Sequence, residues 1–257
     1  MMRGQSKLDR WRNAQGKIWL NVASSHYVLD GFVNLDSHVM MLALDYPLLA
    51  RLVSGRNSSM LAAYREARAK ATLLRHDCRK PLPLPDGSVD HILCSHFLEH
   101  VYPDEAVAIL KDFSRALKPG ATLHVIVPDL EVLARRYIEQ RARGESKAAD
   151  DFVQSSLLST PSRGSLTYRA LELSGGFGLQ HRWMYDGASM RERVAGLGFD
   201  IVPTNSTPSH HFRHGDDSVH IVAHRPVSKA RPARAGPIPS RADENCVSRT
   251  AHGHDHD

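Results

Sequence analysis

The chain is poor in cysteine and has no long apolar run. Its 257 residues include three cysteines, Cys78, Cys94 and Cys246, whose spacing fits neither a metal site nor an even-numbered disulfide framework. A reducing compartment is the simpler environment for such a chain. No apolar stretch approaches the roughly 20 residues of a membrane span, and residues 1–16 lack the apolar core of a signal peptide. We therefore expect a cytoplasmic protein without a membrane span.

Large apolar side chains are almost absent after Arg225. Residues 226–257 are rich in Pro, Arg, Ala and Ser, and such a segment cannot offset the conformational entropy lost on ordering. We predict a disordered basic tail there, whose terminal His252, His254 and His256 would bind transition metals adventitiously. The tail holds five Lys and Arg residues against four Asp and Glu, so with a formal net charge of +5 for the whole chain the remaining residues are only mildly basic. This balance weakly disfavours a dedicated nucleic-acid binder.

Strand and helix patterns alternate along the rest of the chain. Helical composition covers residues 39–71, with a break at 54–59, and a helix starts at Pro103 and is predicted to end at Lys118-Pro119-Gly120. Short apolar runs predict strands at residues 17–22, 32–35, 71–74, 89–95 and 121–129. Strands that alternate with helices indicate an α/β protein with a parallel sheet and right-handed crossovers.

Polar residues follow several of these predicted strands. Ligands of open α/β sheets bind beyond the carboxyl ends of the strands, which are here Ala23-Ser24-Ser25, Asp36, Asp77-Cys78 and Ser95-His96. An acid that closes the second strand is placed to bind a ribose diol, which assigns that role to Asp36. Asp77, as a carboxylate acceptor, would bind the exocyclic amine of adenine. The alternative is that each is an ordinary loop residue.

The segment from Asp77 to Glu131 carries the most specific pattern. It contains PLPLPDGSVD, SHFLEH, LKPG and PDLE, and HRWMY follows at residues 181–185. This succession resembles class I S-adenosylmethionine-dependent methyltransferases of the type 11 kind, in particular a predicted bacterial branch with SHxLEH and HxWMY motifs. The resemblance spans roughly residues 17–225, after an N-terminal extension at 1–16. It implies a Rossmann-like methyltransferase fold, with a mostly parallel seven-stranded sheet covered by helices on both faces, and S-adenosyl-L-methionine as the cofactor.

Glycine is missing where this family has its cofactor loop. The family pattern LNLGCG corresponds to LNVASS at residues 20–25, which the resemblance makes cofactor-binding through Asn21, Ala23, Ser24 and Ser25. Glycine serves in such a turn because it adopts φ > 0 at little cost, whereas alanine there costs on the order of 1 kcal/mol. We expect a modified loop that still binds. The alternative is a non-catalytic methyltransferase-fold protein with a degenerate cofactor loop.

The HFLEH sequence at residues 96–100 also matches the H-x-x-E-H motif of inverted zinc metallopeptidases. That reading requires both histidines on one helix, one turn apart. Here the motif directly follows a predicted strand and is followed by Pro103, so we reject the metallopeptidase and expect no metal. The methyltransferase resemblance instead places His96 beside the cofactor and leaves Glu99-His100 to fix the loop.

Methyl transfer to a hydroxyl or an amine also needs a base for the acceptor's proton. His181 is the candidate catalytic residue, because HRWMY lies where this fold builds its acceptor pocket and because histidine titrates near neutral pH. The alternative is that His181 packs against Trp183 or bonds the backbone. Residues 134–178 indicate a helical insertion or lid, with hinge glycines Gly175, Gly176 and Gly178.

The expected methyl acceptor is inferred from the family resemblance, because no residue of the sequence identifies it. The branch is associated with polysaccharide or glycan metabolism, so we expect a small-molecule or sugar acceptor. An RNA or DNA methyltransferase, in which the basic tail would contact phosphates, is the third hypothesis. The absence of an N-P-P-Y-like motif and of an aromatic stacking platform in the sequence disfavours it.

Overall fold

The computed structural model describes residues 8–159, 180–203 and 217–227. Contacts divide the chain into one unit at residues 1–227 and a second at 228–257. The second unit lies outside the described residues, as do the predicted hinge glycines Gly175, Gly176 and Gly178. Within the described part, no helix combines the length and the apolar character needed to cross a membrane.

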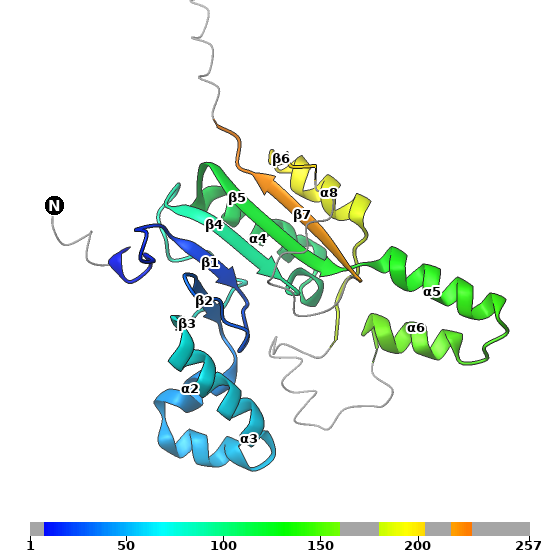
Figure 1. Cartoon of the computed structure of the whole chain (residues 1–257), viewed down its shortest axis with the longest axis horizontal. Coiled ribbons are helices and arrows are strands. Elements are labelled where there is room, and N and C mark those ends of the chain that lie inside the picture. Colours follow the sequence, from blue (N-terminus) through cyan, green and yellow to red (C-terminus); the bar gives the residue numbers. More distant parts are fainter. Residues whose placement is uncertain (1–7, 160–179, 204–216, 228–257) are drawn as a thin grey trace, which may run out of the picture. The chain divides into compact units, whose positions relative to one another are not determined.

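The described strands form one seven-stranded sheet in the order β3-β2-β1-β4-β5-β7-β6 (Figure 1). The pairs formed among β1 to β5 are parallel, and β7 runs antiparallel to both β5 and β6. This confirms the predicted Rossmann-like, mostly parallel sheet. The strand order reverses between β1 and β4, which is where doubly wound folds bind ligands. The strands are β1 Trp19–Val22, β2 Val33–Asp36, β3 Leu73–Arg75, β4 Val89–Ser95, β5 Leu117–Pro128, β6 Asp200–Ile201 and β7 Ser218–His224.

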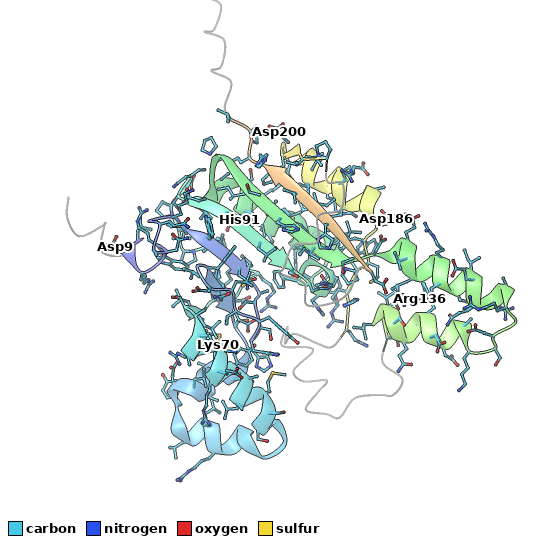
Figure 2. All side chains as sticks on the ribbon, viewed as in Figure 1. Asp9, Lys70, His91, Arg136, Asp186 and Asp200 are labelled. Atoms are coloured by element: carbon cyan, nitrogen blue, oxygen red, sulfur yellow. The ribbon has the colours of Figure 1, made fainter. Side chains whose placement is uncertain are left out.

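In the described part, helices follow β2, β4 and β5. Several begin with a capping side chain, which satisfies backbone N–H groups of the first turn. Asp186, labelled in Figure 2, accepts the backbone N–H of Ser189 at the start of α8. The helical segments are α2 Val39–Asp45, α3 Pro47–Lys70, the 3-10 turn η1 Leu98–His100, α4 Pro103–Ala116, α5 Leu130–Ala142, α6 Ala148–Ser156 and α8 Gly187–Gly196.

Both faces of the sheet bury apolar side chains. Because successive strand residues point to opposite faces, Leu20 and Ile92 join the main core with Phe113 of α4. Leu93, the next residue after Ile92, points to the opposite face and packs in a smaller cluster with Phe32. Burial on both faces is typical of parallel sheets and explains why the strands read as short, nearly continuous apolar runs.

The predicted helix break at residues 54–59 is wrong. α3 runs without interruption from Pro47 to Lys70, and the break lies at Tyr46, whose backbone is extended with φ −123° and ψ 101°. A residue that precedes proline is disfavoured in the helical conformation, so Pro47 ends α2 and starts α3. The two helices pack together around a separate core that contains Tyr64.

The predicted end of α4 is also wrong. α4 ends at Ala116, and Leu117 is already extended and pairs with Val89 as the first residue of β5. Lys118, Pro119 and Gly120 therefore belong to the strand. Gly120 takes φ 78° and donates its N–H to the carbonyl of Arg225, a conformation that glycine adopts at little cost. The glycine permits an irregular strand here and does not cap the helix.

Asn34 on β2 is fully buried and satisfies a set of backbone groups. Its side chain accepts from the N–H of Leu29 and from Nδ2 of Asn21, and donates to the carbonyl of Thr72. We predict that Asn34→Leu, which keeps the size but removes these bonds, lowers the free energy of unfolding by about 2–4 kcal/mol. Urea unfolding measures this loss, and a loss below about 0.5 kcal/mol would show that these bonds add no net stability.

Candidate active site

A cleft opens at the carboxyl ends of β1, β2 and β4, beside the point where the strand order reverses. Five of the residues predicted to bind the cofactor line it, namely Ala23, Ser25, Asp36, Cys78 and His96. The local chain explains the convergence, because each of these residues lies at or just after the end of a strand. Five further residues line the same cleft: Ser37, His38, Tyr64, Phe97 and His100.

Four other predicted residues do not line the cleft. Asn21 is buried and donates to the carbonyl of Tyr27 and to Asn34. The hydroxyl of Ser24, also buried, donates to the carbonyl of Ser25. Ser95 is buried too, and its hydroxyl has no hydrogen-bond partner among the described residues.

Asp77 is the fourth residue outside the cleft lining. Its carboxylate accepts two side-chain bonds from Arg79, each 3.0 Å long, and this pairing holds the pKa of Asp77 below its ordinary value. Asp77 precedes Cys78, which does line the cleft. A contact between Asp77 and adenine therefore stays a prediction, and Arg79 would share the carboxylate.

Asp36 organises the cleft wall through three hydrogen bonds. Its Oδ2 accepts the backbone N–H of Ser25 at 2.8 Å, and its Oδ1 accepts the N–H of His38 at 2.6 Å and the hydroxyl of Tyr64 at 3.2 Å. A carboxylate offers about four acceptor positions, and in the described residues Oδ2 accepts only the bond from Ser25. One position on Oδ2 therefore stays open to a ligand.

The loop after β1 carries the backbone conformation that glycine normally supplies. Ala23 has φ 56° and Ser25 has φ 51°, and His96 at the end of β4 has φ 51°. Among the described residues, the fourth non-glycine with positive φ is Leu157, which caps the end of α6. Three of the four thus line the cleft, and backbone strain of this kind concentrates at functional sites. Ala23 and Ser25 therefore adopt the left-handed conformation whose free-energy cost the sequence predicted for non-glycine residues at these positions.

Tyr64 and His38 line the cleft beside Asp36, although no spacing in the sequence pointed to them. Their rings stack, with centroids 5.3 Å apart and planes 16° apart. Burial lowers the pKa of His38, which Asp36 raises to a lesser degree. His38 also accepts the N–H of Met40 at the start of α2, so its ring is held in place from both sides.

Cys78 contributes an inert wall to the cleft. Burial raises the pKa of its thiol to about 12, and the N–H of Ala23 lowers it to a lesser degree. Because the thiolate is the reactive form, the raised pKa keeps this thiol uncharged and unreactive toward alkylating agents near neutral pH.

The histidine side of the cleft differs from the sequence prediction. His181, the predicted base, is buried and does not line the cleft. It lies behind His100, with ring centroids 4.9 Å apart and the planes at 77°. Burial lowers the pKa of His181, and Glu99 raises it to a lesser degree. Tyr185 of the same segment is buried and has no hydrogen-bond partner for its hydroxyl among the described residues.

The H-x-x-E-H segment does not form the helix that a metallopeptidase needs. His96 follows β4 in the left-handed region, and within residues 96–100 only Leu98–His100 are helical, as a single 3-10 turn. The two histidines therefore do not lie one α-helical turn apart, in agreement with the sequence argument.

Comparison with known proteins supports one class of enzyme. Residues 52–125 match the family model described as a methyltransferase domain, which covers less than a third of the chain. A search of curated proteins finds no match. Together with the seven-stranded Rossmann-like sheet, the family match supports a class I S-adenosylmethionine-dependent methyltransferase, with S-adenosylmethionine as its cofactor.

Solved structures with similar folds include methyltransferases. A SAM-dependent methyltransferase from Methanosarcina mazei is 17% identical with a TM-score of 0.48, and the match covers 82% of this chain and 92% of that one. One from Archaeoglobus fulgidus is 13% identical with a TM-score of 0.44, over 86% and 91% of the two chains. Similarities at this level carry no information about the acceptor.

The strained loop predicts an unusual response to glycine. We expect Ala23→Gly and Ser25→Gly each to raise the free energy of unfolding by about 0.5–1 kcal/mol, because relief of the left-handed strain exceeds the added chain entropy of the unfolded state. Urea unfolding measures the gain. Leu157→Gly relieves a similar φ outside the cleft and is the matched control: it should stabilise the protein without changing S-adenosylhomocysteine affinity. Destabilisation by both cleft variants would contradict the strain.

The Cys78 thiol should resist alkylation. With a pKa of about 12, only about one thiol in ten thousand is ionised at pH 8. We expect iodoacetamide to label the Cys78 peptide far more slowly in the native protein than in urea, with the native rate rising about tenfold per pH unit. Mass spectrometry of the labelled peptide measures both rates, and equal rates at pH 8 would contradict the assignment.

Proposed function

We propose that this chain transfers the methyl group of S-adenosylmethionine to a hydroxyl or an amine of a small molecule or a sugar, including a glycan. The observation that carries the proposal is the position of Asp36, an acid that closes β2 beside the switch point and faces the cleft with an open acceptor position on Oδ2. A ribose diol is the ligand that such an acid binds in doubly wound folds.

The rest of the cofactor has matching groups along the cleft. The adenine would lie toward Cys78, whose uncharged thiol offers an apolar surface, with Asp77 next to it in the chain. The methionine end would lie along Ala23–Ser25, where small residues leave room for the ligand beside the backbone. The sulfonium methyl would then point toward His96, Phe97 and His100, which line the same cleft.

The acceptor would bind on the histidine side. In the reaction, the acceptor's lone pair forms a bond to the methyl carbon, the carbon–sulfur bond breaks, and the sulfur keeps the electron pair as neutral S-adenosylhomocysteine. The proton of the acceptor's hydroxyl or amine is released to water. Because the sulfonium is already activated, the protein mainly has to position the two reactants. His181 would act through His100, which it contacts, as a positioning residue.

A second candidate function is a binding protein without turnover. The observation that favours it is the hydroxyl of Tyr64, which occupies Oδ1 of Asp36 at 3.2 Å. Together with a loop that lacks glycine, this contact would hinder the ribose if Tyr64 cannot move aside. Such a protein would keep the fold but would not bind S-adenosylhomocysteine.

Calorimetric titration of the full chain with S-adenosylhomocysteine tests the proposal. We expect micromolar binding by the wild type and a loss of at least about 10-fold in Asp36→Asn, because a hydrogen bond to a charged group contributes about 1.5–3 kcal/mol.

Asp90→Asn is the matched control for this titration. Asp90 also accepts a backbone N–H, from Ile18, but it lies at the opposite end of β4, so the affinity should stay within about twofold. A folded wild type that shows no binding at millimolar ligand would favour the non-catalytic protein. Equal losses in the two variants would mean that Asp36 acts through stability alone.

A further inference from the structure

Glu99 is a fully buried acid whose side chain accepts no hydrogen bond from the described residues. Its side chain has 1% of its surface exposed, and neither carboxylate oxygen has a hydrogen-bond partner among the described residues. A buried carboxylate is costly unless it is protonated, paired or bound to a cation. Because Glu99 has no hydrogen-bond partner among the described residues, its carboxylate needs another kind of partner, such as a cation.

Imidazoles surround this carboxylate. His96 Nδ1 lies 3.3 Å from Glu99 Oε1, without the geometry of a hydrogen bond, and His100 Nε2 lies 3.9 Å from it. The ligand atoms of Glu99, His100 and His181 lie within 4.8 Å of one another. Two imidazoles and one carboxylate are thus gathered in one buried place.

A hydrogen bond behind the His100 ring sets which of its two nitrogens carries a proton. His100 Nδ1 lies 3.1 Å from the carbonyl of Gln180, and since a carbonyl only accepts, Nδ1 carries the proton. The lone pair of a neutral His100 is then on Nε2, the atom that faces Glu99. The ring of His181 contacts Met184 instead, whose Sδ lies 3.3 Å from its Nδ1. A carbonyl behind a ligating histidine, as at His100, is the usual arrangement at metal sites.

The backbone holds the two segments that carry these residues together. The N–H groups of Arg182 and Trp183 donate to the carbonyl of Glu99 at 2.6 and 3.1 Å, and the N–H of His181 donates to the carbonyl of Leu157 at 2.9 Å. The ligand groups therefore come from a preformed junction, which reduces the entropy lost on binding an ion.

We propose that Glu99, His100 and His181 bind a divalent transition metal ion of the Zn²⁺ class. Nitrogen and oxygen ligands of this kind suit zinc. Tetrahedral ligands at about 2.0–2.1 Å from an ion lie about 3.3 Å apart, so the side chains must close from their present separation of up to 4.8 Å. The sequence motif gave no such site, because His181 lies far from Glu99 in the chain and His96 is not one of the ligands.

Three protein ligands leave one position of a tetrahedral ion open. His100 also lines the cleft, so an acceptor oxygen could take this position, where the metal would favour loss of its proton to water. The oxygen lone pair would then attack the methyl carbon. This use of the ion rests on the proposed function, whereas the metal site itself does not.

Zinc binding by the full chain tests the site directly. The tail histidines would bind metal as well, so the measurements use His252→Gln/His254→Gln/His256→Gln as the background. After equilibration with Zn²⁺ and desalting, inductively coupled plasma mass spectrometry should find one ion per folded chain. Competition with a chromogenic chelator should show at least about a 10-fold loss of affinity in Glu99→Gln and in His181→Gln.

His220→Gln is the matched control, because His124 Nε2 and His220 Nδ1 lie 3.3 Å apart with no carboxylate in the set. It should keep the stoichiometry of the background protein. Circular dichroism checks that each variant is folded, and Zn²⁺ should raise the melting temperature of the background but not of Glu99→Gln. Zinc binding that is absent, that survives both ligand variants or that is lost in His220→Gln would overturn the proposal.

A parallel titration with S-adenosylhomocysteine separates this proposal from the proposed function. If the protein binds S-adenosylhomocysteine but no zinc, the metal-site proposal is wrong and the proposed function stands. If it binds zinc but no S-adenosylhomocysteine, the methyltransferase function is wrong and the metal site stands.

Discussion

The carboxylate of Asp36 is the contact on which the cleft depends. It joins three parts of the chain, since it accepts the N–H of Ser25 after β1, the N–H of His38 before α2 and the hydroxyl of Tyr64 on α3. Ser25 reaches this amide bond with φ 51°, so the bond helps to hold a strained loop. A ligand in the cleft can therefore use only the acceptor position that these bonds leave open on Oδ2 of Asp36.

Sequence reasoning found the sheet and half of the cleft because those features depend on local pattern. Apolar runs predicted the strands, and the carboxyl ends of parallel strands must meet, which placed Asp36, Cys78 and His96 together. Tyr64 could not be predicted in this way, because it reaches Asp36 only through the packing of α3, and the position of that helix depends on the break at Tyr46.

On the histidine side of the cleft, a sequence motif predicted a role that the fold does not support. The HRWMY motif and the ordinary pKa of histidine predict that His181 is the base. The motif does not encode burial, and in the fold His181 is buried behind His100. Glu99 appeared to serve only the loop, and its backbone does so through Arg182 and Trp183. Its side chain is buried and has no hydrogen-bond partner among the described residues, so one residue both closes the junction and forms part of the buried site that the proposed ion would fill.

A crystal structure of the protein with S-adenosylhomocysteine would test the methyltransferase assignment most directly. The predicted result is ligand density in the cleft, with the ribose hydroxyls on Asp36 and the sulfur facing His96 and His100. Density elsewhere, or an empty cleft at saturating ligand with Tyr64 still bonded to Asp36, would contradict it.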